Sequence, residues 1–233
     1  MKKIVYFFFS VFLIHCSTPI AKTMQVKGSV KGLRKGKLYL QKLEDTLLIT
    51  VDSIAVNGDE TFALADNIKS PEFYFLSLDK NDGDSLTDKI LFFGNKGEIT
   101  INTRLRTFSS SADIDGSTNQ PLWNEYQSVI RKFDAKSLEN LQEYINQKGE
   151  ETTDKQFEKL EETNRMLEKR RYLYALNFAM NHSDKEVAAY IGAYEIDNIA
   201  PLFRDSLYNK LSPAVKTSKY GLVFKQQLDS LDR

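Results

Sequence analysis

The pattern of hydrophobic positions changes its period near residue 118. Apolar residues in residues 24–117 alternate with polar ones or form short runs bounded by glycine, asparagine and aspartate, which is typical of β-strands. From residue 118 onward they recur every three or four residues, which is typical of amphipathic helices. The sequence therefore predicts an α+β protein. An N-terminal antiparallel β-sandwich or open barrel occupies residues 24–117, and an all-helical region follows at residues 118–233.

The strand region carries two local signals. The alternation of residues 47–51 and that of residues 54–56 have opposite parity, so we expect one extra residue near Asp52 and Ser53, as a β-bulge or bend. The turn residues Asn57-Gly58-Asp59 predict that the chain reverses there before the next strand.

Three further segments complete the strand region. Residues 72–78 are apolar on both faces, which indicates a strand that is covered on both sides. Residues 90–101 predict a hairpin around Gly94 and Gly97. A polar loop lies between these segments, and its spacing of acids does not match an EF-hand, so we interpret it as solvated rather than as a calcium site. Its acids are Asp79, Asp82, Asp84 and Asp88.

The helical region begins with an antiparallel helix pair. Pro121 suits a first helical turn, and Lys148-Gly149 ends the first apolar stripe. That stripe slips near residues 134–137, where we expect a kink or a break. A second helix is expected from about residue 153 to residue 181, and the short loop favours packing of the two helices against each other. The first stripe could instead bind a partner helix, although packing within the chain is the commoner use. The first stripe is Leu122, Tyr126, Val129, Phe133, Leu138, Leu141 and Ile145, and the second seam is Phe157, Leu160, Leu167, Tyr174 and Phe178.

The N-terminus has the pattern of an export signal. Lys2 and Lys3 precede an apolar run at residues 4–14, which is too short for a bilayer span of about 20 residues. The only cysteine, Cys16, follows immediately and is similar in position to the cysteine of a bacterial lipobox, with His15 where a small residue is usual.

We therefore predict a signal peptide at residues 1–15, lipidation of Cys16 and a lipid-anchored tether at residues 16–23. Ordinary cleavage after Ala21 is the alternative, but it would put Pro19 where a small residue is normal. The predicted location is the cell envelope, with the protein anchored in a membrane and facing the periplasm.

The composition excludes several functions. The chain has 233 residues, with 32 basic and 32 acidic side chains. Removal of residues 1–15 would take away two lysines and no acid, which gives a formal charge of −2. We therefore expect no nucleic-acid partner, because a basic excess supplies most of that binding energy.

No set of residues suited to catalysis, to a metal or to a cofactor stands out. His182 is the only histidine outside the predicted signal peptide, and with one cysteine it cannot form a common zinc site. His182, Ser183 and Asp184 are adjacent in sequence, so they would point apart rather than form a catalytic triad. Ser183 and Glu186 instead match a capping box, which predicts a helix from Asp184 to Glu195 with His182 before its cap.

Several short motifs resemble a β-rich domain of unknown function that forms the N-terminal part of envelope thiol–disulfide oxidoreductase lipoproteins. In the strand region the motifs are Gly28-x-Val30-x-Gly32-Leu33, Gly36-Lys37-Leu38-Tyr39-Leu40, Asp52-Ser53, Gly58 with Phe62, Pro71-x-x-Tyr74-x-Leu76, Gly97-x-Ile99-x-Ile101 and Gly116-Ser117-x-Asn119. In the helical region they are Ala188-Ala189-Tyr190, Leu211-Ser212-Pro213 and Ser218-Lys219-Tyr220-Gly221. The resemblance covers about residues 25–231 and implies a shared fold and envelope location. The family's thioredoxin-like domain and its Cys-x-x-Cys have no counterpart in this sequence, so redox activity is not implied.

These observations lead to one main functional hypothesis and two alternatives. The main hypothesis is a non-catalytic envelope lipoprotein that binds a ligand or a partner protein, for example a separate thioredoxin-like protein. The first alternative is a hydrolase that uses carboxylates or His182. The second is a structural envelope component that self-associates through strand edges rich in tyrosine and phenylalanine.

Overall fold

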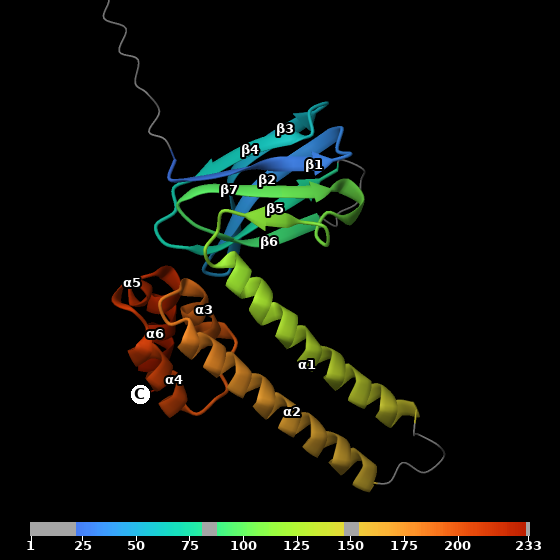
Figure 1. Cartoon of the computed structure of the whole chain (residues 1–233), viewed down its shortest axis with the longest axis vertical. Coiled ribbons are helices and arrows are strands. Elements are labelled where there is room, and N and C mark those ends of the chain that lie inside the picture. The colour runs from blue at the N-terminus through green and yellow to red at the C-terminus, as the bar shows by residue number, and fades with distance from the viewer. Residues whose placement is uncertain (1–21, 81–87, 147–153, 232–233) are drawn as a thin grey trace, which may run out of the picture.

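The protein folds into a β-sandwich followed by a helical part (Figure 1), which confirms the predicted α+β class. The computed structural model describes residues 22–80, 88–146 and 154–231. Cys16, the predicted signal peptide, and Asp82 and Asp84 of the acidic loop lie outside the described residues. The strands are β1 (Met24–Lys31), β2 (Lys35–Glu44), β3 (Leu47–Asn57), β4 (Thr61–Asp66), β5 (Glu72–Asp79), β6 (Asp88–Gly94), β7 (Gly97–Arg104) and β8 (Asp113–Asp115), with a 3-10 turn at Leu105–Thr107. The helices are α1 (Gln120–Asn146), α2 (Asp154–Asn181), α3 (Glu186–Tyr194), α4 (Pro201–Lys210), α5 (Pro213–Lys216) and α6 (Lys219–Leu231).

The sandwich consists of two four-stranded sheets, ordered β4-β1-β7-β8 and β3-β2-β5-β6. All pairs are antiparallel except β1 and β7, which are parallel. The predicted bulge is confirmed, because Leu40 pairs with Asp52 and Gln41 pairs with Thr50, which leaves Val51 as the extra residue on β3. The alternating residues of both sheets fill one core, which includes Val26, Leu38, Leu40, Leu64, Tyr74, Leu76, Phe92, Ile99 and Ile101.

The hairpin predicted at residues 90–101 is wrong. β6 pairs with β5 in one sheet, whereas β7 pairs with β1 and β8 in the other, so the chain crosses between the sheets at Asn95 and Lys96. Apolar alternation cannot distinguish these cases, because a hairpin and a crossing both direct every second side chain into the same core.

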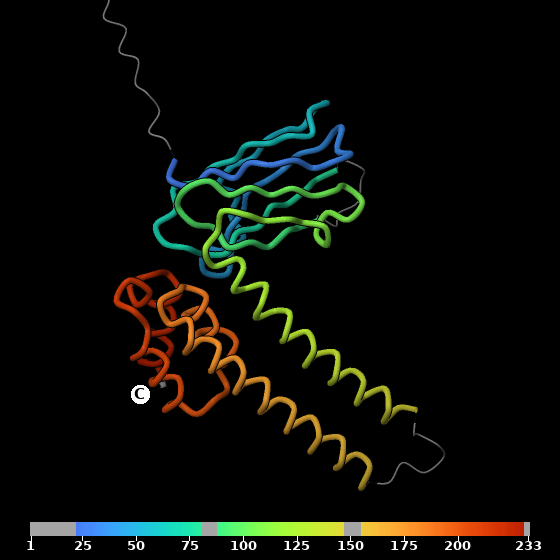
Figure 2. Tube along the Cα trace, in the orientation of Figure 1, coloured from blue at the N-terminus to red at the C-terminus, as the bar shows by residue number. Residues whose placement is uncertain are grey.

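The first two helices form a long antiparallel pair, which we call the arm. Residues 134–137 do not break α1, which is one helix of 27 residues. The predicted second helix is confirmed as α2, with 28 residues. Figure 2 shows that the trace of α3 to α6 gathers around the start of the arm and leaves its far end on its own.

An aromatic cluster, which we call the junction, joins the sandwich to the helical part. Phe73 of β5 and Phe93 of β6 belong to the helical core rather than the sandwich core. The ring of Phe73 lies 4.8 Å from that of Trp123 and 4.7 Å from that of Tyr190, measured between centroids. The backbone amide of Phe73 donates a hydrogen bond of 2.8 Å to the hydroxyl of Tyr220, 147 residues later. Burial raises the pKa of Tyr220, so its hydroxyl stays neutral.

A polar network lies beside the junction. Lys42 lies 3.0 Å from Asp66, which also accepts a hydrogen bond of 2.8 Å from the hydroxyl of Tyr74. Burial alone would raise the pKa of Asp66, but the hydrogen bonds from Tyr74 and Lys42 outweigh it and hold that pKa below its ordinary value. Lys219 of α6 pairs with Glu72 of β5, so the network reaches from the sandwich into the helices.

Removing the Tyr220 hydroxyl should weaken the junction. Tyr220→Phe keeps the ring but leaves the buried amide of Phe73 without its acceptor, which should cost about 1–3 kcal/mol of unfolding free energy in urea denaturation. Tyr194→Phe is the matched control, because this ring is 50% exposed; its effect should stay within about 0.5 kcal/mol. Equal effects of the two variants would contradict the importance of the bond.

Acid should destabilise the fold through Asp66. Because its pKa in the folded state is lowered, ionised Asp66 stabilises the fold above the pKa of an unfolded aspartate, about 3.9, and this contribution is lost as the pH falls through the folded-state pKa. Asp66→Asn should therefore be less stable than wild type near neutral pH and should lose less stability between about pH 5 and pH 2. Urea denaturation at several pH values tests this, and the exposed Asp113→Asn should follow wild type. A pH profile of Asp66→Asn parallel to that of wild type would contradict the assignment.

Candidate binding surface of the helical half

The start of the arm is fixed by one carboxylate and a stack of rings. Glu195, after α3, accepts hydrogen bonds from Tyr126 of α1 (3.1 Å) and from Arg171 of α2 (3.3 Å). Tyr126 stacks on Tyr174 with 6.0 Å between ring centroids. This end of the arm is therefore rigidly held by α3.

The far end of the arm has a polar interior. Beyond Ile130, Asn140 is the only buried residue of α1. Its amide donates a hydrogen bond of 3.1 Å to Asn164 of α2, and farther out the ring of Tyr144 lies 6.1 Å from that of Phe157. This pair of amides fixes which residues of α1 and α2 face each other, but it buries little apolar surface.

Three apolar residues of α1 do not face α2. Leu138, Leu141 and Ile145, which we call the α1 stripe, are 56%, 43% and 54% exposed. At 100° per residue they lie about 130° around the helix from Asn140, which faces α2. The apolar stripe of α1 does change its position around the helix after residues 134–137. The helix itself continues without a break, and the residues that follow turn away from α2.

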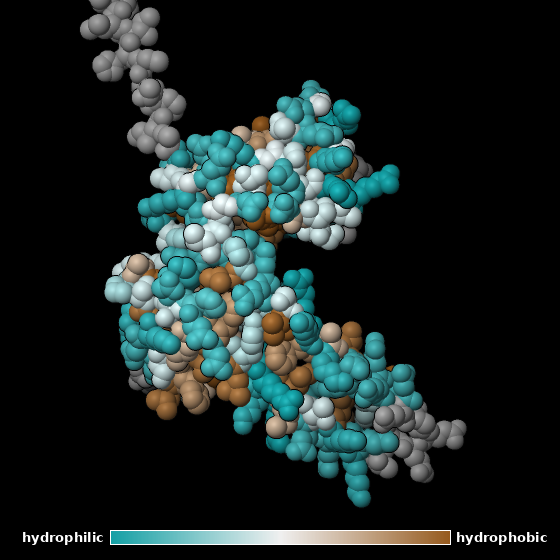
Figure 3. Space-filling view, in the orientation of Figure 1, coloured by the Kyte–Doolittle hydropathy of each residue, from teal (hydrophilic) through white to brown (hydrophobic). Residues whose placement is uncertain are grey.

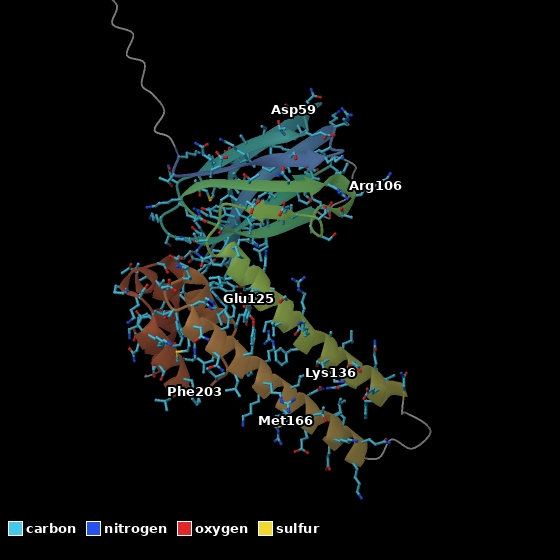
Figure 4. The ribbon with its side chains drawn as sticks, in the orientation of Figure 1. Asp59, Arg106, Glu125, Lys136, Met166 and Phe203 are labelled. Atoms are coloured by element: carbon cyan, nitrogen blue, oxygen red, sulfur yellow. The ribbon has the colours of Figure 1, made fainter. Side chains whose placement is uncertain are left out.

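The α1 stripe lies apart from the charged residues that follow Asp134, while Asp134 itself lies on the same side of α1, one turn before Leu138. The charged residues of residues 135–146 are Lys136, Glu139 and Glu143. The same geometry places all three on the other side of Asn140 from the stripe. Figure 3 shows apolar side chains at the surface of the arm and at the corner formed by α4, and Figure 4 locates Lys136 on α1 and Phe203 at that corner.

A cleft of about 330 Å³ lies between α2 and the start of α4. Its apolar lining consists of Tyr172, Leu173, Leu176, Ile199, Ala200 and Phe203, and its polar lining consists of Arg165, Glu168, Lys169 and Asn198. Tyr172 donates a hydrogen bond of 3.1 Å to Glu168 and accepts one of 3.3 Å from Asn198. The wall formed by α4 is fixed to α6, because buried Arg204 donates a 2.7 Å hydrogen bond to Gln227.

The capping box predicted at Ser183 and Glu186 is wrong. α3 begins at Glu186, and no side chain of its own N-terminal residues caps it. The acceptor comes from Asn119 instead, whose side-chain oxygen accepts a 3.0 Å hydrogen bond from the amide of Val187 while its nitrogen donates to Glu186. The carbonyl of Asn119 also accepts the first hydrogen bond of α1, from Trp123. One buried residue therefore orients both helices, and sequence analysis missed it because the two capped helices lie far apart in the chain.

His182 has a structural environment. Its Nδ1 donates a 2.9 Å hydrogen bond to the carbonyl of Phe178, and its ring lies 4.4 Å from the Phe178 ring. Among the described residues no hydroxyl group is hydrogen-bonded to His182. On α2, Glu162 lies 3.9 Å from Arg165 in an exposed ion pair.

The described residues contain neither a candidate metal site nor a membrane-spanning helix. No group of three or more histidine, cysteine, aspartate or glutamate side chains could hold a metal ion in residues 22–80, 88–146 and 154–231. Within the same ranges, no helix has both the length and the hydropathy needed to cross a membrane.

Comparison with known proteins shows a similarity that is confined to the N-terminal part of the chain. Residues 24–123, from β1 to the first turn of α1, match a family described as a domain of unknown function, DUF4369. No curated protein and no solved structure matches the chain. The match therefore covers the sandwich and the first turn of α1, while the arm and α3 to α6 lie outside it.

Removing the cap from Asn119 should destabilise the protein, whereas removing the Ser183 hydroxyl should not. Asn119→Ala loses the acceptor for the Val187 amide, and we expect a loss of about 1–2 kcal/mol in urea denaturation. Ser183→Ala should change stability by less than about 0.5 kcal/mol. A larger loss for Ser183→Ala than for Asn119→Ala would restore the capping box.

Proposed function

We propose that this protein is a non-catalytic accessory module, tethered to a membrane of the cell envelope through Cys16, that binds a partner protein. The export pattern and the position of Cys16 support the tether. The resemblance to the N-terminal domain of envelope oxidoreductases makes a separate thioredoxin-like protein the first partner to test.

One observation carries the proposal: the α1 stripe is apolar and exposed, and the charged residues of residues 135–146 lie on another side of the helix. Leu138, Leu141 and Ile145 form a ridge on α1, and Asp134 lies at the inner end of this ridge, one turn before Leu138. Depletion of charge around exposed apolar residues is a feature of the centre of protein interfaces. The helical half also carries most of the large apolar side chains that are exposed among the described residues. On that half they are Leu138, Leu141, Ile145, Phe157, Met166, Leu173, Tyr194, Leu202, Phe203 and Leu222.

A protein suits the α1 stripe better than a lipid surface. The far part of α1, residues 134–146, carries Asp134, Glu139 and Glu143 against one cation, Lys136. A net negative segment is repelled by anionic lipid headgroups, which attract lysine and arginine. An apolar ridge with three- and four-residue spacing is instead suited to a groove or helix of another protein.

Crosslinking from the α1 stripe tests the proposal. A photoreactive amino acid at Leu141 in the full-length protein should form a discrete adduct in intact cells, because this position would lie inside the interface. The same amino acid at Glu139, on the other side of α1, should form little or none. Mass spectrometry of the adduct then identifies the partner.

Three results bear on the alternatives. An adduct of the protein with itself would favour the self-associating structural component. Equal crosslinking from positions 141 and 139, or none from either, would contradict the proposed docking surface. Cys16→Ala should move the folded protein from the membrane fraction to the soluble fraction, and unchanged fractionation would contradict the tether.

A further inference from the structure

The cleft between α2 and α4 has the size and lining of a small-ligand site, separate from the α1 stripe. Its volume of about 330 Å³ is at the lower end of the range for ligand pockets, about 300–1,000 Å³. Leu176 is buried in its floor, whereas Leu173 and Phe203 are 48% and 50% exposed at its walls. An apolar group placed in the cleft would lie over Leu176 and between Leu173 and Phe203.

The cleft is polar at one end and apolar at the other. Along α2, Arg165, Glu168 and Lys169 line one end, and Tyr172, Leu173 and Leu176 line the next two turns. The distance along the helix from Lys169 to Leu176 is about 10 Å, which matches the length of a short alkyl chain. The charged residues and the apolar residues therefore lie at opposite ends of the cleft.

The polar end has an excess of positive charge. Glu168 is engaged by the hydroxyl of Tyr172, which in turn accepts from Asn198. Arg165 has an exposed partner, Glu162, at 3.9 Å, and an ion pair that is this exposed contributes little. No ion pair of Lys169 occurs among the residues that the structure describes. An anionic group placed at this end would meet two cations within one turn of helix.

We propose that this cleft binds a free, single-chain amphiphile with an anionic head group, such as a fatty acid. The chain would lie along Leu173, Leu176, Ile199 and Phe203, and the head group would lie beside Arg165 and Lys169. The small volume favours one chain over a two-chain membrane lipid. This inference does not depend on the partner of the arm, because the two surfaces share no residue.

The test uses two soluble probes of equal chain length and opposite charge. Decanoate and decyltrimethylammonium are titrated below their micelle concentrations into the full chain with Cys16→Ala, and amide shifts are followed by NMR. Decanoate should shift residues 172–176 and 198–203 in a saturable manner. Its affinity should exceed that of the cation by about tenfold, since two exposed cations contribute roughly 1–2 kcal/mol together.

Two variants and one control separate the head-group and chain contributions. Arg165→Gln with Lys169→Gln should lower decanoate affinity about tenfold and remove the preference over the cation. Phe203→Ser should weaken both probes equally, because it removes part of the apolar wall. Leu202→Ser is the control, since this neighbour is 72% exposed and does not line the cleft; it should leave both affinities unchanged.

Three outcomes would overturn the proposal. The first is equal or tighter binding of decyltrimethylammonium by the unmodified cleft. The second is a set of decanoate shifts located outside the cleft, or unchanged by Phe203→Ser in a variant that is still folded. The third is binding of anionic phospholipid vesicles through the same residues at a lower lipid concentration than decanoate requires, because this would identify a membrane lipid as the ligand.

Discussion

The strands of the sandwich cannot bury all of its apolar residues, because Phe73 and Phe93 face away from the sandwich core. A sheet face with exposed aromatic rings must be covered by another layer, and here the layer comes from α1, α3 and α6. Edge-to-face contacts with Trp123 and Tyr190 satisfy the rings, and Tyr220 satisfies the backbone amide beside them. The position of the helical half follows from this requirement, and so do the positions of the arm and the cleft.

Some of the motifs noted in the sequence lie at or beside this contact. Pro71-x-x-Tyr74 leads into β5, Asn119 caps α3, and the run from Ser218 to Gly221 contains both Lys219 and Tyr220. Gly221 also lies so close to the carbonyl of Val215 that a Cβ at this position would collide with it. Asn119, Lys219 and Tyr220 each make a contact between segments that are far apart in the chain.

Features that depend on neighbouring residues could be predicted from the sequence, whereas features that depend on residues far apart in the chain could not. The two layers of structure, the bulge at Val51 and the bounds of α2 follow from periodicity, because each depends on neighbouring residues. The errors share a cause. Ser183 and Glu186 have the correct spacing for a capping box, but Asn119, 68 residues from Val187, occupies the site. The crossing between β6 and β7 was read as a hairpin, because the parallel partner β1 lies 73 residues before β7. The cleft had no sequence signal, because its walls come from two helices separated by α3.

The far end of the arm differs from the rest of the molecule in how its helices are held together. Helices in proteins gain most of their stability from packing of an apolar face, and the far end of α1 directs that face away from α2. There α1 is held to α2 by the Asn140–Asn164 pair and by the contact between the rings of Tyr144 and Phe157, and this fixes the register without much burial. A segment of this kind is held in a fixed shape while its apolar residues stay accessible. This is the combination that a docking element needs, because a partner then binds a preformed ridge and little ordering entropy is lost.

The sandwich lies between the proposed lipid tether and the proposed binding surfaces of the helical half. β1, which follows the predicted tether, belongs to the sheet β4-β1-β7-β8, whereas the helical half packs on β5 and β6 of the other sheet. A lipid at Cys16 would therefore attach to one layer of the sandwich, and the arm and the cleft would attach to the other. Force or orientation imposed at the membrane would reach the helical half through the sandwich core and the junction, and through the short connection from β8 to α1. In that arrangement the sandwich would act as a spacer between the proposed tether and the helical half, and the buried rings of the junction would hold the two parts together.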